Sequence, residues 1–206
     1  MNIPKTLRQL AGLAKPTAVL RTTTALVLID IQRDYFGDKL IIPAGEAAVQ
    51  KAAELLAWAR RNRLMVVHVQ HQMPRADSPM FTPGTNGIEF HPAVTPTDGE
   101  RIVVKHFPSS FTQTELNDRL KERGIETLVL CGLMTHLCVD TTARSALEHG
   151  YRTIIARDAC ATRDLPNPEG NGVIPHAAIH AATLAALADR FADVMTTAEI
   201  TSLTME

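Results

Sequence analysis

Short apolar runs alternate with amphipathic stretches along most of the chain. The first run, ALVLI at 25–29, is continuous and is followed directly by Asp30. A run of this kind is typical of a strand buried on both faces of a parallel sheet. Further runs predict strands at 65–69, 101–104, 127–131 and 153–156, and a short sixth strand at 193–195.

Between these runs, apolar residues recur every three or four positions, which predicts helices at 45–61, 114–123, 135–149 and 175–188. Strands that alternate with helices indicate an α/β fold. We therefore predict a three-layer α-β-α, Rossmann-like domain with a mostly parallel central sheet of about six strands. The segment 71–100 is rich in Pro, Gly and Asp and is predicted to be a long loop, which is often functional.

Composition narrows the class of protein. The 206 residues fit one domain, predicted to span 24–206 after an N-terminal extension at 1–23. The net charge of −1 provides no large basic field for nucleic acid or an anionic membrane. Three cysteines are too few for a disulfide framework, and the N-terminus has neither a secretory apolar core nor the roughly 20 apolar residues of a membrane span. We expect a cytoplasmic protein.

Three reactive residues follow predicted strands, where ligands bind in parallel sheets: Asp30, Lys105 and Cys138. The helix N-terminus around Cys138 and the Lys105 ammonium are expected to favour the thiolate. Asp30 is positioned to carry the thiol proton to a leaving amine. Taken singly, the three have ordinary readings as a buried cysteine, a turn aspartate and a solvated lysine. Their joint placement is what indicates an acyl-transfer site.

Three stretches carry a resemblance to a known family: LVLIDIQRDYF (26–36), VVKHFPSSFTQTEL (103–116) and LVLCGLMTHLCVDTTARSALEHGY (128–151). Together they resemble the isochorismatase-like cysteine hydrolases, from about Thr24 to the end of the chain. The resemblance implies a catalytic triad of Asp30, Lys105 and Cys138. It also implies a cis peptide bond at 133–134, and an oxyanion site formed by the backbone N–H groups of Met134 and Cys138.

The resemblance also bears on the reaction. Family members with the complete triad hydrolyse small amides, carbamoyl compounds or ureides, whereas those that cleave the vinyl ether of isochorismate lack the cysteine. A C–N hydrolase is therefore expected. The alternatives are a vinyl-ether hydrolase and a non-catalytic small-molecule-binding or redox-responsive protein on the same fold. The family commonly forms dimers or tetramers, so a homo-oligomer is expected.

No metal or other cofactor is expected. Nicotinamidases of this family bind a metal through an Asp-x-His pair after the first strand, and this chain has no histidine between Asp34 and Lys51. His68 and His71, the nearest candidates, would point to opposite faces of a strand. His68 is expected to pack in the strand, and His71 to belong to a loop or pocket.

Pocket residues are predicted from their nearness to the triad. Gln32, Tyr35, Phe36 and Thr135 are the predicted substrate-binding residues, with core packing as the alternative for those that follow Asp30. His106, Phe107 and His136 also flank the triad, and Cys160 is expected to pack instead. Specificity is expected to lie in the 71–100 loop and in neighbouring subunits. The leucines of the extension are predicted either to pack across a subunit interface or to fold back on their own subunit; they are Leu7, Leu10, Leu13 and Leu20.

Overall fold

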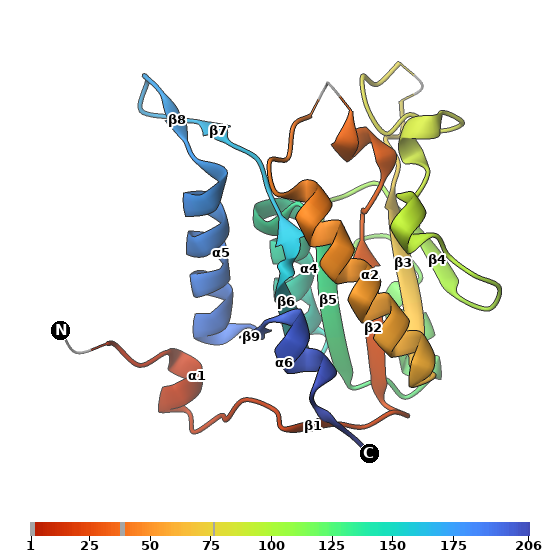
Figure 1. The fold of residues 1–206 in the computed structure, drawn as a ribbon, viewed down its shortest axis with the longest axis vertical. Coiled ribbons are helices and arrows are strands. Elements are labelled where there is room, and N and C mark those ends of the chain that lie inside the picture. The colour runs from red at the N-terminus through yellow and green to blue at the C-terminus, as the bar shows by residue number, and fades with distance from the viewer. Residues whose placement is uncertain (1–2, 38–39, 76) are drawn as a thin grey trace.

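The computed structural model describes residues 3–37, 40–75 and 77–206. Its centre is a parallel sheet with the strand order β4-β3-β2-β5-β6-β9 (Figure 1). The six strands are β2 (Thr24–Ile29), β3 (Met65–His71), β4 (Arg101–Lys105), β5 (Thr127–Leu133), β6 (Arg152–Ala161) and β9 (Asp193–Met195). The predicted parallel sheet of about six strands is confirmed.

Helices cover both faces of this sheet, and Figure 1 shows α2 in front of it and α4 behind it. Residues from α2 and α6 share one hydrophobic core with the sheet, and residues from α3, α4 and α5 share the other. The helices are α2 (Gly45–Arg61), α3 (Leu116–Glu122), α4 (Asp140–Glu148), α5 (His176–Arg190) and α6 (Thr197–Thr201). The three-layer prediction is therefore confirmed. Of the helices in the described part of the chain, none has the length and apolar character needed to cross a membrane.

The central strand β2 explains why the apolar run is unbroken. Ala25, Val27 and Ile29 belong to the core beneath α3, α4 and α5, whereas Leu26 and Leu28 belong to the core beneath α2. Successive side chains point to opposite faces of a strand, and here both faces are covered. Every residue of β2 is buried.

Three strands are at least two residues longer than the sequence pattern predicts, and β3 is one of them, because it continues to His71. β5 continues to Leu133 and β6 to Ala161, past a shift in their pairing register between Leu130 and Gly132. A glycine in β5 and the polar pair Arg157-Asp158 in β6 interrupt the apolar pattern, although the backbone remains extended. Asp158 accepts hydrogen bonds from the backbone N–H and the hydroxyl of Thr197 at the start of α6.

The N-terminal extension folds back on its own subunit. A short helix α1 (Leu7–Leu10) is held by the ion pair between Arg8 and Asp193, 2.7 Å apart, and β1 (Ala18–Val19) pairs in parallel with β10 (Thr204–Met205). The four leucines of the extension remain between 46% and 67% exposed. Polar contacts and the buried Val19 therefore hold the extension in place, and its four leucines face outward.

The loop after β3 is folded over the carboxyl edge of the sheet. It contains two 3-10 turns, at Asn86–Ile88 and Pro92–Val94, and Phe90 forms a β-bridge with Gln32. The Gln32 side chain is fully buried; its amide donates to the carbonyls of His71 and Ile88 and accepts from the N–H of His71. These bonds tie both ends of the loop to the segment that follows β2.

Gly132 allows β5 to lie against β2, and its replacement tests this packing. Its φ is +133°, and a Cβ there would lie 2.0 Å from the carbonyl oxygen of Ile29. We expect Gly132→Ala to lower the free energy of unfolding by at least about 2 kcal/mol, measured by urea denaturation. Gly37→Ala is the control, because a Cβ at Gly37 meets nothing within 4 Å; it should change stability by less than about 0.5 kcal/mol. Equal stability of the two variants would contradict the close approach.

Candidate active site

The strand order of the sheet runs outward from its two central strands, β2 and β5, in two directions. The chain runs from β2 through β3 to β4, then returns to β5 beside β2 and continues through β6 to β9. Ligands in such sheets bind at the carboxyl ends of the strands on either side of this switch point. Asp30 follows β2, Lys105 ends β4, and Cys138 lies in the turn after β5. The structure thus brings the three predicted catalytic residues to one edge of the sheet.

Asp30 and Lys105 form a completely buried ion pair. Lys105 Nζ lies 2.7 Å from the Asp30 carboxylate, and both side chains are 0% exposed. Asp30 has a φ of +52°, a conformation that aspartate adopts more readily than most residues. Lys105 Nζ also donates to the carbonyl oxygen of Phe107 at 3.0 Å. The ammonium is therefore held at a fixed point among acceptors.

Cys138 lies within reach of both charges. Its Sγ is 3.3 Å from Lys105 Nζ, and its thiol is within hydrogen-bond reach of Asp30. The residue belongs to a π-helical turn, Thr135–Val139, that precedes α4, so the predicted helix begins with a wider turn than expected. The peptide bond between Leu133 and Met134, just before this turn, is cis, as the family resemblance implied.

Burial dominates the electrostatics of the pair and the thiol. Burial and then the negative charge of Asp30 raise the pKa of the Cys138 thiol, and the Lys105 ammonium does not fully offset them. Burial also raises the pKa of Asp30, against the opposing effect of Lys105. Lys105 does favour the thiolate, as expected, but burial and the Asp30 charge outweigh it and leave the net pKa of the thiol raised. A thiol with a raised pKa keeps its proton near neutral pH, and the adjacent carboxylate is positioned to accept that proton.

His71 completes the surroundings of Lys105. It pairs with Lys105 in the register of β3 and β4, and its Nδ1 lies 3.3 Å from Lys105 Nζ. Burial and the Lys105 charge lower the pKa of His71 to about 4. The imidazole is therefore neutral near pH 7, and Nδ1 must accept, because an ammonium can only donate. The structure confirms His71 as a pocket residue.

A pocket of about 450 Å³ opens directly above Cys138. Its walls are mainly apolar and come from the segment after β2, the loop after β3 and the cysteine turn. Apolar side chains contribute Leu40, Met73, Met80, Phe81, Met134 and Leu137, and polar ones contribute Tyr35, His71, His106 and Arg163. Mostly apolar walls with a few converging polar groups are typical of small-molecule sites.

The predicted substrate-binding residues divide into two groups. Tyr35 lines this pocket and is 3% exposed. Gln32, Phe36 and Thr135 are not among its lining residues. Gln32 braces the loop as described above, Phe36 packs on the His91 ring with centroids 4.8 Å apart, and the Thr135 hydroxyl bonds to His180 Nδ1 at 2.9 Å.

Arg163 is the pocket residue that sequence reasoning missed. It follows β6, whose predicted end at Ala156 left this arginine far from any strand end. Its Nε is buried and has no hydrogen-bond partner among the described residues, while Nη1 donates to the Asp164 carbonyl. Had the full length of β6 been recognised, the carboxyl-end rule would have pointed to Arg163.

Histidines and acidic residues do not gather into a metal site in the part of the chain that the structure describes. No group of three His, Cys, Asp or Glu side chains there could hold an ion. His68 bonds to Glu100 on the face of β3 opposite to His71. The three cysteines are free and buried, and Cys160 packs in the core beneath α3, α4 and α5.

Comparisons with known proteins identify the family of this chain. Residues 24–199 match the Isochorismatase domain family. The chain is 44% identical over 176 residues to YddQ, an uncharacterized isochorismatase family protein of Bacillus subtilis, covering 85% of this chain and 97% of that protein. A solved isochorismatase structure from Pseudomonas putida superposes with a TM-score of 0.88 at 36% identity, over 95% of this chain and 98% of that one.

Other relatives have names that state a reaction or a location. Maleamate amidohydrolase of Pseudomonas putida is 33% identical, over 84% of this chain and 82% of that protein. The structure of N-carbamoylsarcosine amidase from Thermoplasma acidophilum has a TM-score of 0.72 at 28% identity, over 85% of this chain and 96% of that one. Isc1 of Verticillium dahliae, a secreted isochorismatase effector, is 36% identical, over 94% of this chain and 97% of that protein. With its fold, its triad positions and these matches, the chain belongs to the isochorismatase family of hydrolases.

Proposed function

We propose that this protein hydrolyses a C–N bond in a small amide, carbamoyl compound or ureide, with Cys138 as the nucleophile. The observation that carries the proposal is the position of Cys138 Sγ at the floor of the pocket, 3.3 Å from Lys105 Nζ and within hydrogen-bond reach of Asp30. The amidohydrolases and amidases among the relatives support the reaction class.

The first half of the reaction forms a covalent intermediate. Asp30 accepts the thiol proton as Cys138 Sγ attacks the substrate carbonyl carbon. The carbonyl oxygen becomes an oxyanion, which the backbone N–H groups of Met134 and Cys138 would hold. When the tetrahedral intermediate collapses, the C–N bond breaks and Asp30 returns the proton to the departing nitrogen. The products of this half are a thioester and ammonia or an amine.

The second half regenerates the enzyme. Asp30 removes a proton from a water molecule, whose oxygen attacks the thioester carbon. The C–S bond then breaks, and the proton returns to Cys138 Sγ as the carboxylic or carbamic acid leaves. Lys105 stays charged throughout and holds Asp30 in place at 2.7 Å. Its ammonium also faces the sulfur, where negative charge develops in both halves.

Arg163 indicates the class of substrate. It brings a cation into a pocket whose other walls are mostly apolar, and part of its guanidinium is buried without a partner among the described residues. A guanidinium fork matches a carboxylate. We therefore propose an amide or ureide that also carries a carboxylate. Maleamate and N-carbamoylsarcosine, named in the relatives' titles, are both compounds of this kind.

Cellular location and assembly belong to the same proposal. Three free cysteines fit a reducing compartment, so we place the protein in the cytoplasm, although the relative Isc1 is a secreted protein. We also expect a homo-oligomer, in which the exposed leucines of the extension would become buried.

Ammonia release from a panel of small amides, carbamoyl compounds and ureides tests the reaction. We expect one compound to release ammonia, and Cys138→Ala to reduce the rate at least about a thousandfold, since no other group near the pocket floor can form the thioester. Cys160→Ala is the matched control and should keep activity, because Cys160 is not among the residues that line the pocket. Turnover that survives in Cys138→Ala, or cleavage of isochorismate instead of any amide, would refute the proposed mechanism.

Replacing Arg163 tests the substrate class. Arg163→Met keeps much of the side-chain volume and removes the charge. For a carboxylated amide we expect KM to rise about tenfold or more with little change in kcat, because a charge-assisted bond to a remote group is lost. An uncharged amide of similar size should show no rise, and neither should Arg190→Met, which alters an exposed arginine at the end of α5. Equal effects on charged and uncharged amides would rule out a carboxylate contact.

The pH dependence of alkylation tests the state of the resting thiol. Because the pKa of Cys138 is raised, its thiolate fraction should still be climbing at pH 8.5. Iodoacetamide labelling of Cys138 should therefore increase about tenfold for each pH unit between 7 and 9. Mass spectrometry measures the labelling, with Cys138→Ser as the background for the other two cysteines. A plateau below pH 8.5 would show a lowered pKa.

A further inference from the structure

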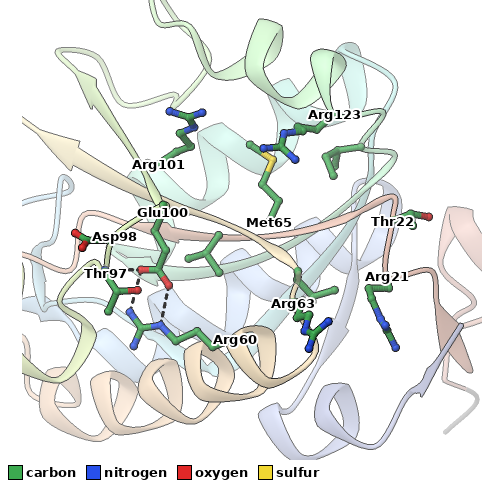
Figure 2. A pocket seen from close by; sticks show the side chains of 14 residues that line it. Arg21, Thr22, Arg60, Arg63, Met65, Thr97, Asp98, Glu100, Arg101 and Arg123 are labelled. Atoms are coloured by element: carbon green, nitrogen blue, oxygen red, sulfur yellow. Dashed lines mark hydrogen bonds and ion pairs between the residues drawn. The ribbon is translucent and has the colours of Figure 1, made fainter.

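A second cavity, of about 520 Å³, lies at the opposite edge of the sheet. Its walls come from segments that precede or begin the strands β2, β3, β4 and β5 (Figure 2). Arg101 and Lys105 are the two ends of β4, so the cavity is separated from the catalytic ammonium by about 13 Å of strand. This cavity takes no part in the reaction proposed above.

Five arginines line the cavity, and one of them is neutralised. Arg60 forms two hydrogen bonds to the Glu100 carboxylate, at 2.7 and 2.9 Å. Glu100 also accepts from the Thr97 N–H and contacts His68. Burial acts to raise the pKa of Glu100, but these bonds outweigh it and lower the value to about 2. The Arg60–Glu100 pair therefore adds no net charge to the cavity.

The other four arginines keep their charge. Arg21, Arg63, Arg101 and Arg123 have no side-chain hydrogen bond or ion pair within the described ranges, and the remaining carboxylate in the lining is Asp98. Four cations against one anion leave an excess of three positive charges. In a chain whose net charge is −1, this is a concentrated positive field.

Helix ends account for only part of this arrangement. Arg123 caps the carboxyl end of α3, and Arg63 lies two residues beyond α2, so each can offset the partial negative charge of a helix C-terminus. Arg101 begins a strand, and Arg21 precedes one with its N–H bonded to the Glu206 carbonyl. Neither is at a helix end. The shared feature of all four is the cavity.

The spread of the charges indicates the shape of a ligand. In Figure 2, Arg101 and Arg123 lie at one side of the hollow and Arg21 and Arg63 at the other, with Met65 between them. Cations on two sides of a cavity of about 520 Å³ suit a ligand that carries several anionic groups along its length, such as a chain of phosphates. The apolar side chains of Leu64, Met65 and Ile125 also line the cavity, and they offer a surface for an organic group.

We propose that this cavity binds a small polyphosphate anion with three or more negative charges. Guanidinium groups pair with phosphate oxygens through two parallel hydrogen bonds, and their charge persists at any physiological pH. The cavity volume falls in the range of about 300–1,000 Å³ that is typical of small-ligand sites. The anion is either an inorganic polyphosphate or a nucleoside polyphosphate, and both present the same phosphate chain to the arginines.

Isothermal titration calorimetry in 150 mM NaCl without divalent metal, with sodium triphosphate and ATP as separate probes, tests the site. We expect saturable binding with one site per chain. The double variant Arg63→Gln/Arg123→Gln should weaken binding at least about tenfold, because it removes one guanidinium from each side of the cavity. Arg61→Gln/Arg190→Gln removes the same total charge from exposed positions outside the cavity and should change the Kd less than about twofold. If the first double variant does not fold, Arg101→Gln replaces it with the same expectation.

The titration results distinguish between the two kinds of ligand and can refute the site. Tighter binding of ATP than of triphosphate would support the site and indicate that the nucleoside rests on the apolar wall at Met65. Equal binding of the two probes would support the site and identify the phosphate chain as the ligand. The proposal fails if neither probe shows saturable binding, or if both double variants weaken binding equally, which would indicate general charge attraction. None of these results depends on the amidase reaction.

Discussion

Asp30 and Lys105 are two charges held 2.7 Å apart with no exposed side-chain surface, and the candidate active site of this protein is arranged around them. Either charge alone would be very unfavourable there, and removing one partner of a buried pair typically costs about 3–5 kcal/mol. The pair therefore constrains the strands that carry it: β2 ends just before Asp30, and β4 ends at Lys105. The cysteine turn must then come to the same point, because the Lys105 ammonium faces the sulfur as well as the carboxylate.

The order of the strands in the sheet satisfies this constraint. Asp30 follows the central strand and Cys138 follows its neighbour, so the switch in chain direction places them side by side. Lys105 reaches them from the far edge, across β3, with His71 as its neighbour in register. A long, flexible lysine is well suited to that distance, since its ammonium can extend beyond the strand end while its aliphatic stem stays buried.

Sequence analysis predicted the features that depend on short stretches of the chain, such as buried strands and the residues that follow them. The unbroken apolar run predicted that β2 is buried on both faces, and the reactive residues after predicted strands predicted which side chains would meet at one edge of the sheet. Gln32 and Thr135 turned out differently because each buried polar side chain found a partner inside the protein: backbone groups for the amide and His180 for the hydroxyl. Nothing in the local sequence pattern specifies such partners. The carbonyls that bind Gln32 lie 39 and 56 residues further along the chain, and His180 lies 45 residues beyond Thr135.

Arg163 and the arginine-lined cavity were missed for a related reason. β6 carries charged residues in its second half, so its true end could not be located by apolar pattern alone. The cavity arginines are separated by tens of residues, and each one taken singly resembles an ordinary solvated side chain. Only the folded sheet brings the starts of four strands together and shows that these charges line one cavity.

The protonated state of the buried cysteine has a consequence for the lifetime of the protein. Peroxide and other oxidants attack a thiolate much faster than a thiol, and susceptible cysteines are usually exposed and of low pKa. Cys138 is 3% exposed and its pKa is raised, so little of its sulfur is present as the thiolate that an oxidant attacks. A nucleophile that is activated only by substrate would allow the protein to survive oxidative stress that inactivates enzymes with permanently ionised cysteines.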